Sequence, residues 1–135
     1  MYNLTLPVPP SINGYYGHIA KGNRVIKYIK KEGKEYRKFV IHWCIRNKMQ
    51  LRANLPLQMD IKYYFKDKRK RDLDNPLKSL LDALTHAEVY EDDDLIQKMT
   101  IEKFYDKENP RVEITISQYE PKEEYIERIT VRKEV

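Results

Sequence analysis

The chain has little cysteine, little glycine and no long apolar run, and each shortage excludes a class of protein. Its 135 residues include one cysteine, Cys44, and four glycines. A single cysteine excludes an intrachain disulfide and a zinc site built from several cysteines. Glycine-rich phosphate loops and Ser-His-Asp arrangements are absent as well. No segment approaches the ~20 consecutive apolar residues that span a bilayer, and the first residues do not resemble a signal peptide. We therefore expect a cytoplasmic protein that has no membrane partner.

Charged residues are abundant and positive charge is in excess. The 26 Lys and Arg outnumber the 21 Asp and Glu, which gives a formal net charge of +5. This excess favours a polyanionic partner such as nucleic acid and carries no information about the fold. A chain of this length with 41% hydrophobic residues is long enough for one compact domain and too short for two. We expect that domain to cover residues 1–119, followed by a charged C-terminal extension at 120–135.

Hydrophobic periodicity predicts an α+β domain. Strict alternation over residues 57–65 predicts the clearest strand. Apolar residues at spacings of three and four between Tyr36 and Cys44 predict a helix whose buried face includes that cysteine. Residues 9–18, rich in proline, are expected to form a loop. The expected strands cover residues 2–6, 24–28, 57–65, 99–105 and 112–116, and the expected helices cover 31–49 and 75–87. This order is typical of a mixed β-sheet with two main helices packed on one face.

The most informative feature is a basic strip followed by acids. The strip consists of Lys66, Lys68, Arg69, Lys70 and Arg71. Asp72 and Asp74 follow directly, and Glu91 to Asp94 form a second acidic segment. A protein that only holds a phosphate backbone gains from Lys and Arg and loses from neighbouring Asp. Carboxylates beside a basic strip therefore indicate a divalent cation and metal-dependent phosphodiester cleavage.

Spacing suggests how these residues meet. Residues two apart on an extended chain point the same way, so we expect Asp72 and Asp74 to face one pocket while Leu73 faces the core. The acidic segment at 91–94 supplies a third carboxylate if the strand after it pairs beside the strand before Asp72. Lys78 lies one helical turn beyond Asp74, where its ammonium could offset charge on a scissile phosphate or pair with a carboxylate.

Simpler interpretations of the same residues remain open at this stage. Asn75 before Pro76 is typical of a helix start, and acids at 91–94 are typical of a solvated turn. The basic strip and Lys78 also fit an ordinary exposed surface. His18 could contact phosphate or act as an acid or base, although a lone histidine in a loop is more often incidental.

Two tyrosines in the predicted loop are candidate contacts for bases. Tyr15 and Tyr16 could stack on unpaired bases, as aromatic side chains do in nucleic-acid sites. The chain contains eleven tyrosines, however, and most of them must simply pack.

The sequence resembles the RusA family of crossover-junction endodeoxyribonucleases. The blocks that carry the resemblance are Leu6-Pro7-Val8-Pro9-Pro10-Ser11-Ile12-Asn13 with Tyr15-Tyr16, Arg71-Asp72-Leu73-Asp74-Asn75 with Lys78, Leu81-Asp82-Ala83-Leu84, and Asp92-Asp93. One departure is Glu88, because relatives often place glycine after the second helix. Glycine suits the left-handed position at a helix end, so Glu88 affects where the helix exits and how Asp93 is aimed.

This resemblance implies an α+β homodimer that binds four-way (Holliday) DNA junctions and nicks two opposed strands with Mg²⁺ or Mn²⁺. It implies that Asp72, Asp74 and Asp93 bind the metal and that Lys78 is essential, while Asp92 and Asp94 leave the third ligand ambiguous by one residue. Asn13, Tyr15, Tyr16 and the basic strip would contact the DNA. The family is often encoded by phages and prophages.

Other functions fit the residues alone. A divalent-metal nuclease could act on flaps or single strands instead. A non-catalytic DNA-binding module would use the acids as helix caps and solubilising turns. A third reading is an interaction protein that docks a partner through its charged C-terminal extension.

Overall fold

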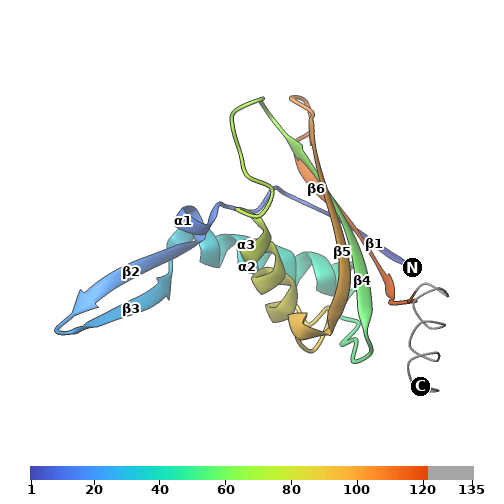
Figure 1. The fold of residues 1–135 in the computed structure, drawn as a ribbon, viewed down its shortest axis with the longest axis horizontal. Coiled ribbons are helices and arrows are strands. Elements are labelled where there is room, and N and C mark those ends of the chain that lie inside the picture. Colours follow the sequence, from blue (N-terminus) through green and yellow to red (C-terminus); the bar gives the residue numbers. More distant parts are fainter. Residues whose placement is uncertain (122–135) are drawn as a thin grey trace, which may run out of the picture.

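The computed structural model describes residues 1–121 as a mixed β-sheet covered on one face by two helices. The elements in chain order are β1 (Tyr2–Leu6), α1 (Ile12–Tyr15), β2 (Tyr16–Lys21), β3 (Arg24–Ile29), α2 (Lys31–Arg46), β4 (Leu57–Phe65), α3 (Leu77–His86), the 3-10 helix η1 (Asp93–Leu95), β5 (Ile96–Tyr105) and β6 (Arg111–Gln118). Figure 1 shows α2 and α3 side by side on one side of the sheet, while β2 and β3 project away from the main body. The predicted α+β class, with a mixed sheet and two main helices on one face, is confirmed.

The four-stranded sheet has the order β1-β6-β4-β5. β6 pairs antiparallel with both β1 and β4, whereas β4 and β5 are parallel. A parallel pair needs a crossover connection, and α3 provides it between β4 and β5. The loop that contains residues 66–76 leads from the end of β4 to the start of α3 (Figure 1). The basic strip and the first two aspartates therefore lie at one end of the sheet.

Alternation along the strands builds the core. In β4 every second side chain is buried, and β6 repeats this pattern beside it. Helix α3 adds Leu80, Ala83 and Leu84, and α2 adds Val40 and Cys44. Burial of Cys44 confirms the predicted core position, and burial raises the pKa of its thiol to about 11. That thiol is therefore unreactive near neutral pH.

Most predicted elements are present, with shifted ends. The strand predicted at 24–28 is β3, and those predicted at 99–105 and 112–116 extend to 96–105 and 111–118. The helix predicted at 31–49 ends at Arg46. The predicted extension at 120–135 falls almost entirely outside the described residues.

Two local predictions are wrong. Residues 9–18 do not form one loop, because Ile12–Tyr15 is a short helix and β2 begins at Tyr16. The first helical residue of α3 is Leu77, and Asn75 does not cap that helix. Its side-chain oxygen instead accepts a 3.0 Å hydrogen bond from the backbone N–H of Ile12. That bond ties the turn before α3 to the start of α1.

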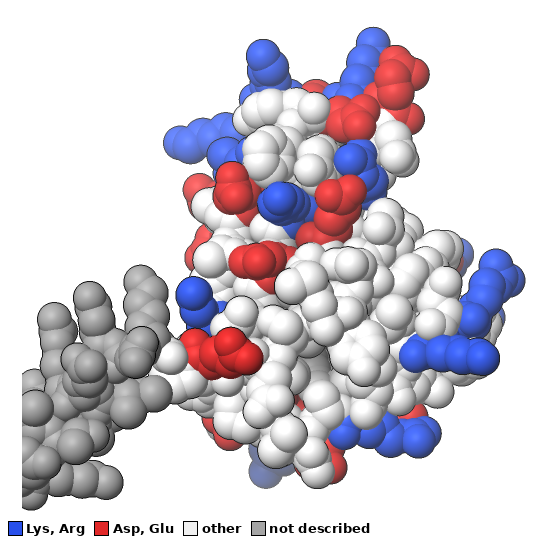
Figure 2. Space-filling model, turned by 90° about the vertical axis from the view of Figure 1, so that its right-hand side faces the viewer, with Lys and Arg blue, Asp and Glu red and all other residues white. Residues whose placement is uncertain are grey.

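The sheet face turned away from the helices carries mixed charge. Figure 2 shows this side of the molecule, with basic and acidic side chains interspersed toward the top and a largely uncharged centre. Lys62 on β4, for example, lies in register with Glu102 on β5 and Glu113 on β6. Among the helices of residues 1–121, none combines the length and apolar character needed to cross a bilayer.

Candidate active site

Two cavities lie around the segment that joins β4 to α3. The first, here called the acidic cavity, measures about 380 Å³ and is lined by Tyr16, Asp74, Leu77, Lys78, Leu81, Asp82, Thr85, Asp92 and Asp93. The second, here called the basic cavity, measures about 540 Å³ and is lined by Pro7, Val8, Pro9, Ser11, Phe65, Lys66, Lys70, Arg71, Asp72, Asn75, Pro76 and Pro110. Most of the predicted site residues are thus divided between two cavities, whereas Asn13, Tyr15, Lys68 and Arg69 line neither.

The acidic cavity unites two of the predicted aspartates with the predicted lysine. Asp74 and Lys78 come from the two sides of the α3 start, and Asp93 comes from η1, just before β5. The third carboxylate depended on the condition that the strand after residues 91–94 pairs beside β4. That condition is met, and this pairing brings the chain after α3 back toward Asp74. Asp94 is absent from the lining, whereas Asp92 and Asp93 are both present.

Asp72 lies elsewhere. It lines the basic cavity, and residues 73–76 form a turn in place of the extended chain that was expected. The backbone N–H of Asn75 donates to the Asp72 carbonyl at 3.3 Å, which closes this turn. The expectation that Asp72 and Asp74 face one pocket is therefore wrong for this structure. Leu73 does not face the core either, because 37% of it is exposed.

The donor set of the acidic cavity suits a hard divalent cation. Mg²⁺ binds one or two carboxylates and retains several waters for the remainder of its octahedron. Asp74, Asp92 and Asp93 supply such carboxylates. Within residues 1–121 no three Asp, Glu, His or Cys side chains are already grouped closely enough to enclose an ion. The residues therefore fit a cation held by few protein ligands and open to substrate.

Charge is crowded at Asp92 and Asp93. The pKa of Asp93 is raised, chiefly because its carboxyl shares a hydrogen bond with Asp92, and also by burial and by the neighbouring charges of Asp92 and Asp94. The backbone N–H of Asp94 donates to Asp92 Oδ1 at 3.2 Å and lowers the pKa of Asp92. Two adjacent carboxylates hold negative charge that a metal ion can neutralise.

Tyr16 forms the aromatic wall of this cavity. The residue is 8% exposed, and the Lys78 Nζ atom lies 5.3 Å from the ring centroid. The ammonium of Lys27 on β3 lies over the same ring, 4.0 Å from its centroid. The cavity therefore has carboxylates on one part of its lining and two ammonium groups beside the tyrosine.

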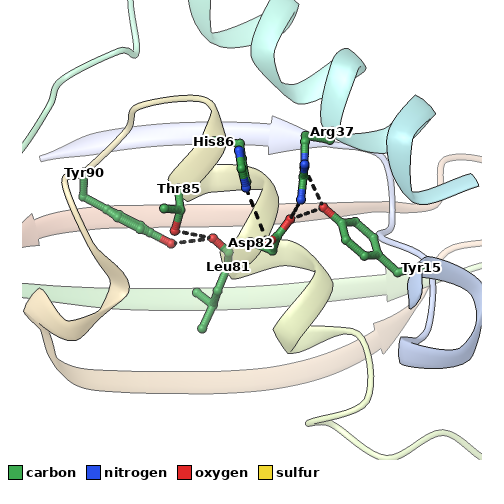
Figure 3. Close-up of polar contacts among 7 residues, drawn as sticks. All are labelled: Tyr15, Arg37, Leu81, Asp82, Thr85, His86 and Tyr90. Carbon is green, nitrogen blue, oxygen red and sulfur yellow. Dashed lines mark hydrogen bonds and ion pairs between the residues drawn. The ribbon is translucent and has the colours of Figure 1, made fainter. Parts of the chain in front are cut away.

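A hydrogen-bond network fixes the remaining acid of the cavity. Figure 3 shows Asp82 on α3 facing Tyr15, Arg37 and His86. The Tyr15 hydroxyl and Arg37 both donate to Asp82 Oδ2, and the Arg37 distance is 2.7 Å. His86 Nε2 lies 3.7 Å from Asp82 Oδ1. Burial acts to raise the pKa of Asp82, but hydrogen bonds from Tyr15 and Arg37 outweigh it and keep that pKa below its ordinary value.

This network also changes the interpretation of Tyr15. The residue is fully buried, and burial together with its hydrogen bond to Asp82 raises its pKa. A ring without exposed surface cannot stack on an unpaired base, so the predicted base contact of Tyr15 does not agree with its position. The residue instead connects α1 to Asp82 on α3.

The basic strip lies around the basic cavity. Lys66, Lys68, Arg69 and Lys70 are exposed, as is Asn13 on α1. Arg71 is half-buried, and its guanidinium pairs with Asp67 at 2.8 Å and lies 4.6 Å from the centroid of the Phe65 ring. The first four side chains are accessible to a DNA backbone, whereas Arg71 also shapes the loop that carries the strip.

Comparisons with known proteins identify the family of this chain. The profile of the family described as "Endodeoxyribonuclease RusA" matches residues 7–117. The chain belongs to this family. It is similar to the crossover junction endodeoxyribonuclease rusA of Enterobacteria phage 82 and to its counterpart from Shigella sonnei strain Ss046, each 35% identical over 117 residues. The protein of the same name from Escherichia coli strain K12 is 34% identical over 117 residues. Each match covers 87% of this chain and 94% of the relative.

The RusA match includes both cavities and the hairpin of β2 and β3, since all of them lie within residues 7–117. Two contributors to the site have no signal in sequence spacing. Asp82 acquires its partners Tyr15 and Arg37 only through the tertiary fold. Lys27 reaches the Tyr16 ring because β2 and β3 pair antiparallel.

Proposed function

We propose that this protein is a divalent-metal-dependent endonuclease that resolves four-way DNA junctions by paired, symmetric nicks. The observation that carries the proposal is the acidic cavity, where Asp74, Asp92, Asp93 and Lys78 meet in a chain of the RusA family. The names of the curated relatives supply the substrate, because they are crossover junction endodeoxyribonucleases.

Asp74 and Asp93 are the proposed carboxylate ligands in the acidic cavity, and Asp72 is the proposed third ligand from the adjoining turn. When bound, Mg²⁺ or Mn²⁺ supplies charge neutralisation at the phosphate and lowers the pKa of an attacking water. The Lys78 ammonium stabilises the negative charge that develops on the phosphoryl oxygens. The DNA backbone is held beside this cavity by the basic strip, which consists of Lys66, Lys68, Arg69, Lys70 and Arg71. Asn13 and Tyr16 make further contacts with the DNA.

Paired nicks require two active sites on one junction, so we propose that the enzyme acts as a homodimer. Its place of action would be the bacterial cytoplasm, in DNA recombination and repair, and a phage or prophage gene is a fitting source. Support for this setting comes from relatives in a phage and in enteric bacteria.

The decisive experiment uses a labelled four-way junction and a linear duplex of the same sequence. With Mg²⁺ the protein should nick two opposed strands of the junction at symmetric positions, and without a divalent ion it should cut nothing. Equal rates on the linear duplex would contradict junction specificity. Preferred cutting of flaps or single strands would identify a different divalent-metal nuclease, and binding without cutting would identify a DNA-binding module.

A further inference from the structure

The hairpin formed by β2 and β3 carries positive charge to which the proposed function gives no role. It projects from the body of the protein (Figure 1), and its turn is made possible by Gly22, whose φ is +63°. Residues 16–29 include Lys21, Arg24 and Lys27 but no Asp or Glu. A local excess of three positive charges within a chain of net charge +5 favours a polyanion along this arm.

Strand register assigns the hairpin side chains to two faces. Directly opposed residues share a face and successive pairs alternate, so the pairs Tyr16↔Ile29 and His18↔Lys27 lie on the same face. Tyr16 belongs to the lining of the acidic cavity. The face with His18 and Lys27 therefore continues from that cavity along the arm. The opposite face carries Ile19 and Ile26 as an exposed pair.

Lys27 and Lys78 converge on one aromatic ring. Their ammonium groups lie 4.0 Å and 5.3 Å from the centroid of Tyr16. The proximity of Lys78, with some loss of hydration, lowers the pKa of Lys27. Neither lysine forms an ion pair within 4.0 Å among residues 1–121. An anion beside the two groups would relieve their repulsion, and consecutive phosphates of one DNA strand supply such anions.

We propose that the His18 and Lys27 face of the hairpin is a phosphate-binding subsite for the DNA strand that leaves the acidic cavity. This inference rests on the proposed function, because it assumes that the scissile phosphate lies beside Lys78. Lys27 contacts the neighbouring phosphate, whereas the pair Lys21↔Arg24 lies on the opposite face, next to the turn of the arm. A two-stranded ribbon with basic side chains is a shape that fits a groove of duplex DNA.

The test measures binding of a synthetic four-way junction without divalent metal over a range of salt concentrations. Lys27→Gln removes the charge, Lys27→Arg retains it, and Lys62→Gln makes the same chemical change on the far face of the sheet. Loss of one phosphate contact should weaken binding about eightfold near ~0.1 M salt, because each contact contributes about 0.9 to the slope of log affinity against log salt. Lys27→Gln should therefore bind more weakly with a slope smaller by about 1, whereas Lys27→Arg and Lys62→Gln should behave like the unaltered protein.

Identical salt slopes for Lys27→Gln and Lys62→Gln would overturn the inference. The inference would also fail if the hairpin binds a second copy of this chain instead of DNA. In that case Ile19→Ser would convert a dimer to a monomer in sedimentation, and Lys27→Gln would have the same salt slope as the unaltered protein. Failure of the proposed function looks different, because the unaltered protein would then bind the junction without cutting it in Mg²⁺. The salt slopes of the variants can still be compared in that case.

Discussion

The acidic cavity and the basic cavity are both lined in part by the short segment 72–78, yet their linings are suited to different tasks. The acidic cavity gathers Asp74, Asp82, Asp92 and Asp93 with a single lining lysine, Lys78. The basic cavity combines Lys66, Lys70 and Arg71 with prolines and one acid, Asp72. Carboxylates attract a cation and repel a phosphate backbone, whereas ammonium and guanidinium groups do the reverse. We therefore propose that residues 73–76 divide most of the residues for chemistry from those that hold DNA, with Asp72 as the one proposed metal ligand in the basic cavity. The variants below test that division.

The largest expected effect comes from Asp74→Asn in the acidic cavity. Loss of a carboxylate ligand should lower the single-turnover cleavage rate of a four-way junction by at least about 100-fold. Binding should be kept or improved, because one charge that repels phosphate is gone. Glu91→Gln, an exposed acid outside both cavities, serves as the matched control and should cut at the normal rate. Undiminished cleavage by Asp74→Asn would remove the acidic cavity from the chemistry.

The acids before β5 can be ranked by the same assay. Asp93→Asn should lose cleavage to a similar extent, whereas Asp94→Asn should retain it, because Asp94 does not line the acidic cavity. The Mg²⁺ concentration that gives half-maximal rate should rise for Asp93→Asn and stay constant for Asp94→Asn. If Asp94→Asn lost cleavage and Asp93→Asn retained it, the metal ligand before β5 would be Asp94 and not Asp93.

Asp82→Asn should act on stability, although Asp82 also lines the acidic cavity. Its side chain is 23% exposed and accepts hydrogen bonds from Tyr15 and Arg37. Loss of the negative charge and of one of the two acceptor oxygens should lower the free energy of unfolding by about 1–3 kcal/mol, as measured by urea denaturation. The Mg²⁺ requirement for cleavage should stay the same. An altered Mg²⁺ requirement with unchanged stability would make Asp82 a ligand and would extend the chemical part of the cavity.

The stability effect of Asp82→Asn should depend on pH. Because the pKa of Asp82 is depressed in the folded protein, its stabilising effect is present above the unfolded pKa of about 3.9 and is lost as the pH falls through the folded pKa. The stability difference between the unaltered protein and Asp82→Asn should therefore be constant near neutral pH and shrink below about pH 4. A stability difference that grows as the pH falls would contradict the role of Asp82 as a charged acceptor for Tyr15 and Arg37.

Lys70→Gln tests the basic cavity. Removal of one exposed phosphate contact should weaken junction binding about eightfold near ~0.1 M salt and reduce the salt slope by about 1. Cleavage at saturating protein should change little, because Lys70 is absent from the acidic cavity. Lys62→Gln again provides the control. If Lys70→Gln lowered the cleavage rate at saturating protein without weakening junction binding, Lys70 would act in cleavage and the proposed division between the two cavities would be wrong.

The smallest effect is expected at Glu88, which directs the chain from α3 toward the acidic cavity. Its φ is +63°, and the N–H groups of Glu88 and Val89 donate to the carbonyls of Thr85 and Leu84. This is a Schellman ending with a non-glycine residue in the left-handed position. Glu88→Gly should relieve up to ~1 kcal/mol of backbone strain, partly offset by the lost pair with Arg52 at 3.1 Å. Glu88→Gly should have a slightly higher midpoint of thermal denaturation than the unaltered protein, with unchanged cleavage. A lower midpoint would show that the left-handed backbone at Glu88 is not strained.

The sequence contained enough information for the sheet and for most of its elements. β4 was predictable because one face is buried and the other is not, so its alternation is strict. β2 was missed because the side chains from His18 to Lys21 are all exposed, which leaves no alternation. Apolar spacing also predicted the helix that contains Leu80 and Leu84, while its start was shifted because Asn75 bonds to a residue 63 positions away.

The site was predictable in composition but not in arrangement. The spacing of Asp74 and Lys78 on either side of a helix start was sufficient to expect them together. The separation of Asp72 depends on a turn closed by backbone hydrogen bonds, which an assumption of extended chain could not reveal. The network around Asp82 depends on residues from α1, α2 and α3, whose proximity arises only from tertiary packing.

The location of a bound metal ion tests the account most directly. Crystals of the protein soaked in Mn²⁺ should give an anomalous diffraction peak within coordination distance of Asp74 and Asp93, and Asp74→Asn crystals should lose it. A peak only among Lys66, Lys70 and Asp72, or no peak at concentrations that support cleavage, would contradict the assignment of the acidic cavity as the catalytic centre.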